Sequence, residues 1–519
     1  MNVIYFLGIM AVRVRFAPSP TGWIHIGNMR TVLFGYLFAK KEQGQFILRI
    51  EDTDQKRKVP NGIKGIVETL EVMGMTPDEG PGFGGKFGPY VQSERLDIYK
   101  KYSQELIEKG QAYYCFCSAE RLTELREQQK AAGVRPMYDG HCKKLTSEEV
   151  TAKLDAGESH VVRMIIPKGR IVEFEDVVYG KISFNTNDVD EQVLIKSDGF
   201  PTYQFAVVID DHLMEISHIM RGEDWLSSTP KQLLLYEYLG WEVPRFVHVP
   251  NVLNADRKGK LSKRKGAVAA IDFIRQGYIR EALFNFLCLV GWNPDPKVAH
   301  QDEFYSQEFL TEHFDINRIK RSGGALDMRK LDAINTMWLQ SLTPAQLFEK
   351  VMVWKDEVAK KYVIDDVLGV SEELAEQKKA TELLTTYLEK NPAIAEDLLT
   401  LVQPRIKKLS DIWDWYRFIL EEPTFGVDAI KSVVGDKDIK NLITQLQTTI
   451  MGLSSWDQEP WEAAIRSYAD SLEMKHGDLF MILRVIVTGR KVSPPLRELM
   501  VLLGKDFVTT RFQTLLSIV

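Results

Sequence analysis

Cysteine is scarce in this chain, at 4 of 519 residues. So few cysteines in so long a chain exclude a disulfide framework. Three of them fall within residues 115–142, which favours a reducing compartment and makes a bound metal one use for them. Basic residues are not in excess either, since the formal net charge is −6. The chain therefore has no bulk attraction to nucleic acid, and any RNA contact must come from local basic surface.

Long apolar runs are also missing. Near a terminus the only one is Val3–Val12, which has no basic segment ahead of it, is too short to span a bilayer and has no cleavage site. We therefore expect a cytoplasmic protein without membrane contact, with residues 1–9 as an extension or with Met10 as the natural start. Internal repeats and low-complexity segments are absent. The length and the 45% hydrophobic content favour several domains with buried cores.

The strongest local pattern is Arg15–Asn28, with the sequence RFAPSPTGWIHIGN. Val12–Phe16 predicts a buried strand, the prolines and glycines a tight turn, and Met29–Lys41 a helix. Such a connection aims backbone N–H groups and the positive end of a helix at a ligand above the sheet, usually a phosphate. His25 and Asn28 flank the helix start and can donate hydrogen bonds to phosphate oxygens. A proline-rich turn with a solvated histidine is the alternative.

Charged residues follow other predicted strands. The strand Phe46–Ile50 is followed by Glu51, which could hold an amino group or could belong to a capped helix start. Phe200–His212 predicts another buried strand, and Ile216–Met220 predicts one that ends at Arg221. Ligands bind at the carboxyl ends of parallel strands. A buried arginine there needs an anionic partner, which either a structural carboxylate or a substrate could supply.

Two further segments carry chemistry. Lys258–Gly266 is rich in lysine and alone would be a solvated basic loop. Cys115 and Cys117 precede a charged helix, and Cys142 follows it, which is a plausible zinc cluster with one ligand position still to fill. His141 is one candidate for that position, and three reduced cysteines without metal are the alternative.

The later part of the chain changes character. Val161–Leu194 predicts short alternating strands of a small α+β subdomain. After Phe273 the pattern is helical, with apolar stripes that belong to buried cores. Gly323 and Gly324 mark a junction between helical segments.

The segment Arg15–Asn28 resembles the nucleotide-binding signature of the class I aminoacyl-tRNA synthetases, and most of all its version in the glutamyl enzymes. The general motif ends in a second histidine, where this chain has Asn28. Lys260–Arg264, with the sequence KLSKR, resembles the mobile triphosphate loop of the same class. Ile47–Arg95 is again similar to the glutamyl enzymes. The helical C-terminal region matches the bacterial branch rather than the glutaminyl relatives, which end in β-barrels.

The resemblance implies an α/β fold in which a Rossmann-type parallel sheet carries an inserted α+β acceptor-binding subdomain and precedes an all-α anticodon-binding region. The expected parts are the first half of the catalytic domain (1–95), the acceptor-binding insertion (96–202), the second half of the catalytic domain (203–257), a stem-contact region with the KLSKR loop (258–337) and the anticodon-binding region (338–519).

The implied activity is ATP-dependent ligation of L-glutamate to the terminal adenosine of tRNA(Glu), through an adenylate, with Mg²⁺ accompanying ATP. We expect a monomer. Glutamylation of a modified tRNA base, or a non-catalytic tRNA-binding paralogue, are the alternatives. The long helical tail argues against the first alternative, and the intact motifs against the second. Whether tRNA(Gln) is also charged stays open.

The resemblance also implies roles for individual residues. Glutamate carries two carboxylates, for which Arg15 and Arg221 are the expected cations. The implied catalytic residues are His25, Lys260 and Lys263. Those implied for ATP are Pro18, Gly27, Asn28, Lys260, Ser262, Lys263 and Arg264. Those implied for glutamate are Arg15, Ser19, Glu51, Tyr203 and Arg221. Arg405 is the implied reader of the last anticodon base. Some members of the family bind zinc with residues that match Cys115, Cys117, Tyr138 and Cys142, whereas others use a histidine where this chain has Lys144.

Overall fold

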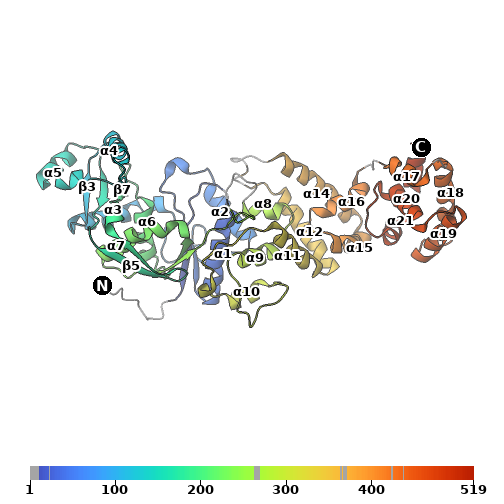
Figure 1. Ribbon diagram of the computed structural model, residues 1–519, viewed down its shortest axis with the longest axis horizontal. Helices are drawn as coiled ribbons and strands as arrows, with labels where there is room; N and C mark the ends of the chain where they lie inside the picture. The colour runs from blue at the N-terminus through green and yellow to red at the C-terminus, as the bar shows by residue number, and fades with distance from the viewer. Residues whose placement is uncertain are drawn as a thin grey trace. The chain divides into compact units, whose positions relative to one another are not determined.

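The computed structural model describes residues 11–22, 24–261, 269–362, 365, 371–421, 425–435 and 438–519. The contacts divide the chain into two compact units, which are described separately. The first unit contains residues 1–271, 284–328 and 362–368, and the second contains residues 272–283, 329–361 and 369–519. Strands belong to the first unit, in the blue to green part of the ribbon, while the orange to red part is helical (Figure 1).

A six-stranded sheet forms the centre of the first unit, with the strand order β2-β1-β8-β9-β5-β6. The strands are β1 (Arg13–Phe16), β2 (Gln45–Leu48), β5 (Ile171–Asp176), β6 (Gly180–Asn185), β8 (His218–Gly222) and β9 (Arg245–Val249). All neighbours run parallel except β5 and β6, which form an antiparallel pair. The predicted parallel sheet is thus confirmed, and its short, buried apolar strands are typical of sheets covered on both faces.

The segment between the halves of this sheet contributes to two sheets. A three-stranded antiparallel sheet consists of β3 (Ala112–Cys115), β4 (Val161–Met164) and β7 (Val193–Ile195). Strands β5 and β6, from the same segment of the chain, instead extend the six-stranded sheet, where Asp176 of β5 pairs with Phe246 of β9. The predicted short strands of this segment are therefore present, but only some of them form a separate small sheet.

Helices complete the first unit. They are α1 (Ile26–Lys41), α2 (Gly62–Val72), α3 (Leu96–Glu108), α4 (Ala119–Ala131), α5 (Ser147–Asp155), α6 (Tyr203–Leu213), α7 (Thr229–Leu239) and α10 (Gln307–His313). Helix α1 follows β1 as predicted, although it begins at Ile26 because His25 caps it. Helices α4 and α5 lie beside β3 and β7 in the cyan part of the ribbon (Figure 1).

The predicted strand Phe200–His212 was wrong, because most of it is helix α6. The Thr202 carbonyl accepts hydrogen bonds from the N–H groups of Phe205 and Ala206, at 3.2 and 3.0 Å, which starts the helix. The residues from Phe205 to Asp211 are buried without interruption. A run buried on all sides shows neither the alternation of a strand nor the period of a helix, so its pattern could not separate the two.

The second unit is entirely helical in its described residues, as the fold prediction required. After α8 (Ala270–Arg275) and α9 (Arg280–Leu289), the helices are α11 (Met328–Gln340), α12 (Pro344–Ala359), α14 (Glu372–Lys390), α15 (Pro392–Val402), α16 (Asp411–Leu420), α17 (Val427–Val434), α18 (Ile439–Met451), α19 (Gln458–Ser471), α20 (His476–Thr488) and α21 (Leu496–Leu516). The predicted apolar stripe of α18 is buried through Leu442, Ile443, Leu446 and Ile450, against a core that includes Trp461. Among the helices of the described residues, none combines the length and the apolar character needed to cross a bilayer.

Candidate active site

A cavity of about 350 Å³ opens where β1 and β8 end, which we call the Arg221 cavity. Both strands contribute their carboxyl ends, where open α/β sheets bind ligands. Its lining includes many of the predicted residues. They are Arg15, Pro18, Ser19, His25, Asn28, Tyr203 and Arg221. A volume in this range suits a small-molecule ligand.

His25 caps helix α1 at one wall of this cavity. Its Nδ1 accepts a hydrogen bond from the Gly27 N–H at 3.1 Å. The neutral ring must then carry its proton on Nε2, which becomes a donor. A Cβ on residue 27 would lie 3.2 Å from His25 Nδ1, so glycine permits this close approach. A helix N-terminus with a donor of this kind beside it can hold a phosphate group.

Arg15 projects from β1 into a buried network of charges. Asp211 of α6 accepts hydrogen bonds from Arg15 Nε at 2.9 Å and Nη2 at 3.2 Å. The same carboxylate accepts one from Arg49 Nη1 at 2.6 Å. Although burial opposes the charged form, Asp211 outweighs it and raises the pKa of Arg15. The two arginines flanking Asp211 lower the pKa of its carboxyl despite burial, so it stays ionised.

Glu51 follows β2 and joins the same network. Its N–H donates to the Pro18 carbonyl at 2.9 Å, which ties this strand end to the loop after β1. Arg49 Nη2 donates to Glu51 Oε1 at 3.0 Å. Burial raises the pKa of Glu51 to about 7, even though Arg49 and Arg15 favour its charged form. Glu51 lies near enough to Arg15 and Tyr203 for their charges to interact, but it is not among the residues that line the Arg221 cavity.

Arg221 emerges from β8 and is almost fully buried. Its Nε donates to His248 Nε2 at 3.0 Å and its Nη2 to Thr229 Oγ1 at 2.9 Å. Its Nη1 is buried and forms no well-made hydrogen bond with any residue that the structure describes. Burial lowers the pKa of Arg221, although the neighbouring Tyr203 hydroxyl opposes the shift. The Tyr203 ring packs on Trp225 with centroids 4.3 Å apart.

The predicted triphosphate loop is described only at its start. Lys260 is exposed and forms an ion pair with Asp224, and it does not line the Arg221 cavity. Ser262, Lys263 and Arg264 lie outside the described residues. Gly27 contributes through its N–H to the His25 cap rather than as a lining residue.

Sequence reasoning missed Arg49 and Asp211, which form a buried ion-pair network with Arg15 and Glu51. Each has a charged side chain inside an apolar run, and both are buried. A charge within a buried element requires a partner of opposite sign, and that was the signal available. Which carboxylate pairs with which arginine depends on contacts between residues far apart in the sequence.

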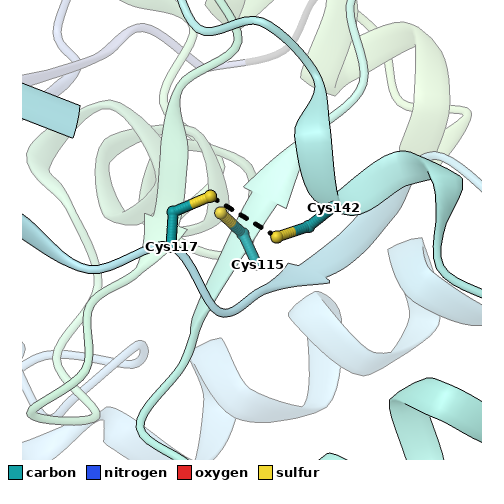
Figure 2. Close-up of side chains that lie close together, drawn as sticks. All are labelled: Cys115, Cys117 and Cys142. Atoms are coloured by element: carbon teal, nitrogen blue, oxygen red, sulfur yellow. Dashed lines mark hydrogen bonds between the residues drawn. The ribbon is translucent and has the colours of Figure 1, made fainter. Parts of the chain in front are cut away.

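The three clustered cysteines lie together in the first unit, on β3, the loop after it and the turn at residue 142. Figure 2 shows their sulfur atoms pointing toward one another, with Cys117 and Cys142 Sγ 3.5 Å apart. All three lie within 4.8 Å of one another. The Tyr138 hydroxyl is 3.4 Å from the sulfurs of both Cys115 and Cys117. His141 is exposed and outside this group.

These cysteines fit a zinc site. Tetrahedral zinc with Zn–S bonds of about 2.3 Å places sulfurs about 3.8 Å apart, close to the spacing seen here. Burial raises the pKa of Cys117 to about 11, and the neighbouring thiols add to the shift. The Arg163 guanidinium lies over the Tyr138 ring at 4.2 Å, and Arg121 donates to Cys117 Sγ at 3.5 Å.

A second cavity, of about 510 Å³, lies within the helical unit, and we call it the Arg405 cavity. Its lining is mainly charged. The lining residues are Arg405, Lys407, Asp411, Asp414, Trp415, Arg490, Lys491 and Val492. Arg405 is exposed, and its Nη1 donates to the Leu401 carbonyl at 2.9 Å.

Two family models match the chain. The model described as "tRNA synthetases class I (E and Q), catalytic domain" matches residues 11–333. The model described as "Anticodon binding domain" matches residues 373–516. Together they cover the sheet-containing part and most of the helical part of the chain.

Individual proteins match over nearly the full length. A glutamate–tRNA ligase of Alkaliphilus metalliredigens (strain QYMF) is 41% identical over 514 residues, covering 97% of this chain and 98% of that protein. The corresponding enzyme of Clostridioides difficile (strain 630) is 40% identical over 514 residues, covering 97% and 98%. The crystal structure of a glutamate tRNA ligase from Elizabethkingia meningosepticum, in complex with its amino acid, matches with a TM-score of 0.82 and 33% identity, covering 98% of this chain and 99% of that one.

Proposed function

The chain belongs to the glutamate–tRNA ligases of the class I tRNA synthetases, and from that premise we propose that it activates glutamate with ATP in the Arg221 cavity. The observation that carries the proposal is the buried Arg221, which lines a cavity together with the helix cap at His25 and whose Nη1 forms no hydrogen bond of good geometry with any described residue. An anion-binding cation and a phosphate-binding helix end thus share one small space.

Charge supports glutamate as the amino acid. Among the described residues no carboxylate forms an ion pair with Arg221, whose Nε and Nη2 donate to His248 and Thr229 instead, whereas Arg15 is paired with Asp211. Glutamate, with two carboxylates and one ammonium group, would supply a carboxylate to Arg221 as well as one to Arg15. Glutamine has no net charge and would leave a buried cation unmatched, which costs free energy.

Within this network we assign Arg15 and Tyr203 to the side-chain carboxylate and Glu51 to the ammonium group, with Ser19 nearby. Asp211 accepts hydrogen bonds from Nε and Nη2 of Arg15, and the Met220 carbonyl accepts a long one, of 3.4 Å, from Nη1, so Arg15 has little donor capacity left for the substrate. Arg221 Nη1 forms no hydrogen bond of good geometry with any described residue, so it can donate to a carboxylate. The two arginines therefore contribute unequally, and Arg221 is the stronger anchor.

ATP with Mg²⁺ is the second substrate. We assign its phosphates to the loop at Pro18, the helix start at Gly27 and Asn28, and the donor Nε2 of His25. Lys260, Ser262, Lys263 and Arg264 would bind the other side of the triphosphate. Lys260 must leave its ion pair with Asp224 to do so. Such reactions are accelerated by aligning the reactants and by stabilising charge on phosphate oxygens.

Two displacement steps complete the reaction. A carboxylate oxygen of glutamate bonds to the α-phosphorus of ATP, and the bond to pyrophosphate breaks, which releases pyrophosphate. A ribose hydroxyl of the terminal adenosine of tRNA then bonds to the acyl carbon, and AMP leaves. The chain needs no covalent nucleophile of its own for either step.

The remaining parts of the chain have proposed roles that follow the predicted division at residues 95, 202, 257 and 337. The insertion holds a structural Zn²⁺ through Cys115, Cys117 and Cys142, with Tyr138 as the fourth ligand, and receives the acceptor end of tRNA. The Arg405 cavity receives the anticodon, with Arg405 at its last base. Its exposed cations suit a polyanion, and Trp415 could stack on a base.

Charging assays test the proposal. The full chain with glutamate, ATP and tRNA(Glu) should form glutamyl-tRNA, and tRNA lacking its terminal adenosine should accept nothing. Labelling of that shortened tRNA would instead indicate base glutamylation, and labelling of neither would indicate a non-catalytic paralogue. Similarity over nearly the full length to glutamate–tRNA ligases does not favour either alternative. A parallel assay with tRNA(Gln) defines the tRNA range.

Metal analysis tests the zinc site. The purified chain should contain about one Zn²⁺ per molecule, and Cys115→Ser should lose it. Cys288→Ser is the matched control, because Cys288 is buried but lies outside the cluster. Absence of zinc from the wild-type chain would contradict the proposed site.

A further inference from the structure

Arg221 is held by a buried chain of hydrogen bonds that reaches Asp176. His248 Nε2 accepts from Arg221 Nε at 3.0 Å, and His248 Nδ1 lies 2.7 Å from Asp176 Oδ2. His248 is 0% and Asp176 1% exposed. The three residues come from β8, β9 and the end of β5, which are neighbours in the six-stranded sheet. The chain of contacts therefore links a cavity residue to the interior of the sheet.

The direction of these hydrogen bonds is fixed by chemistry. The Nε–H of arginine can only donate, so His248 Nε2 must be the bare nitrogen and Nδ1 must carry the proton. That proton is donated to the Asp176 carboxylate, which selects this tautomer. Burial lowers the pKa of His248, although Asp176 opposes the shift, so the ring stays neutral and keeps its acceptor.

Asp176 is itself held rigidly. Its Oδ1 accepts hydrogen bonds from the N–H groups of Val178 and Tyr179, both at 2.9 Å. Its Oδ2 accepts a further one from the His248 N–H at 3.0 Å. With both oxygens engaged by backbone, the carboxylate cannot turn away from the imidazole.

The other side of the guanidinium group is also occupied. Thr229 Oγ1 accepts from Arg221 Nη2 at 2.9 Å and donates to the Trp225 carbonyl at 3.2 Å. The hydroxyl proton is therefore directed away from His248 Nε2. Two fixed acceptors, on Nε and on Nη2, define the plane of the guanidinium group. Nη1, beside the Tyr203 hydroxyl, then has no hydrogen bond of good geometry with any described residue and can donate to a ligand.

We propose that His248 is a positioning residue of the glutamate site, which accepts from Arg221 Nε and thereby aims Nη1 at a carboxylate of the bound amino acid. Asp176 sets the tautomer that makes this possible. The inference rests on the proposed role of Arg221 in binding glutamate. It assigns a function to two buried residues that do not touch the substrate.

Steady-state charging by the full-length chain tests the inference, with KM for glutamate, KM for ATP and kcat measured separately. His248→Leu fills the space but removes the acceptor, and should raise KM for glutamate roughly ten- to a hundredfold, the range for loss of an outer-shell partner, with little change in KM for ATP. His248→Gln supplies an amide oxygen as acceptor and should restore most of the affinity. Asp176→Asn turns an N–H toward Nδ1, which moves the ring proton to face Arg221, and should resemble His248→Leu.

The matched control is His218→Leu, which removes another buried histidine, at the start of β8 rather than beside Arg221. Its KM for glutamate should equal that of the wild type. If His248→Gln is as impaired as His248→Leu, shape rather than hydrogen bonding matters and the inference fails. Should His248→Leu not fold, His248→Gln and Asp176→Asn decide, because only the second should raise KM.

Arg221→Gln separates this inference from the function on which it rests. An unchanged KM for glutamate in Arg221→Gln would overturn the proposed role of Arg221. A raised KM in Arg221→Gln, together with a normal KM in His248→Leu, would overturn the positioning role alone.

Discussion

The Arg221 cavity and the Arg405 cavity both collect cations, but they hold them differently. Arg15 and Arg221 are buried, and each is fixed by at least two side-chain hydrogen bonds. Arg405, Lys407 and the other cations of the Arg405 cavity are exposed. The first arrangement suits a small ligand that must leave water completely, and the second suits a long polyanion that stays partly solvated.

The contrast has an energetic reason. A buried cation has lost its hydration, so its charge must be balanced by partners within the protein. Any N–H group that these partners leave free interacts strongly with a ligand of opposite charge, because little water screens the interaction. An exposed cation keeps its water and contributes little alone, but several together release counterions from RNA. We therefore expect selectivity for one amino acid from the Arg221 cavity, and salt-sensitive attraction to tRNA from the Arg405 cavity.

The largest expected effect comes from removing a carboxylate that pairs with arginines at the Arg221 cavity. Asp211→Ala removes the carboxylate that pairs with both Arg15 and Arg49 but leaves the two arginines buried. It should lower the free energy of unfolding by about 3–5 kcal/mol. Asp414→Ala, at an exposed carboxylate of the Arg405 cavity, should change it by less than about 0.5 kcal/mol. Urea denaturation of the full-length variants measures both. Equal effects would remove the distinction between the two cavities.

The next effect concerns catalysis. His25→Ala removes a fixed donor to the phosphates and should raise the barrier by about 3 kcal/mol, which lowers kcat roughly a hundredfold. KM for glutamate should stay nearly unchanged, because the cation network remains. The exposed His300 provides the control, and His300→Ala should leave kcat as it is. A large rise in KM with normal kcat would place His25 in amino-acid binding instead.

The pH dependence of glutamate binding tests the assignment of Glu51 to the ammonium group. Its pKa of about 7 lies above the usual value, so the side chain is increasingly protonated as pH falls through 7 and loses its charge for an ammonium group. KM for glutamate should therefore rise about tenfold for each pH unit below 7, in step with the loss of ionised Glu51. Glu51→Gln should give a high KM without this slope. A flat or opposite profile in the wild type would mean that Glu51 only balances the charge of Arg49.

The contrast between the two cavities also explains what the sequence could predict. The strand–loop–helix at Arg15–Asn28 is local, and local turn chemistry predicted it closely. Helix stripes such as that of α18 have one buried face, and their period is visible. Both kinds of pattern lie within a short stretch of chain, so neither needed knowledge of tertiary contacts.

The missed features depend on tertiary contacts. Helix α6 was predicted as a strand because burial on all sides erased its period. Its Asp211 pairs with Arg15, which lies 196 positions earlier, and no local pattern joins the two. His248 lies in the apolar strand β9, and only the sheet order places it between Asp176 and Arg221. Sequence thus indicated which cations the site contains, but not what holds them.

The smallest expected effect concerns the exposed cations of the Arg405 cavity. Lys407→Ala, at an exposed cation that lines the Arg405 cavity, should weaken tRNA binding and reduce the slope of log affinity against log salt by about 0.7 to 1, the contribution of one phosphate contact. KM for glutamate should not change. Arg466→Ala, at an exposed arginine that pairs with Glu462 in the same helical unit, should leave the slope unaltered.

Filter binding of labelled tRNA between 50 and 200 mM salt measures the slope, with KM for glutamate followed over the same range, roughly a fourfold change in ionic strength. If salt changed the affinity for glutamate as strongly as the affinity for tRNA, the buried and the exposed cations would not differ in their sensitivity to salt. Burial would then not be the property that separates the two sets of cations.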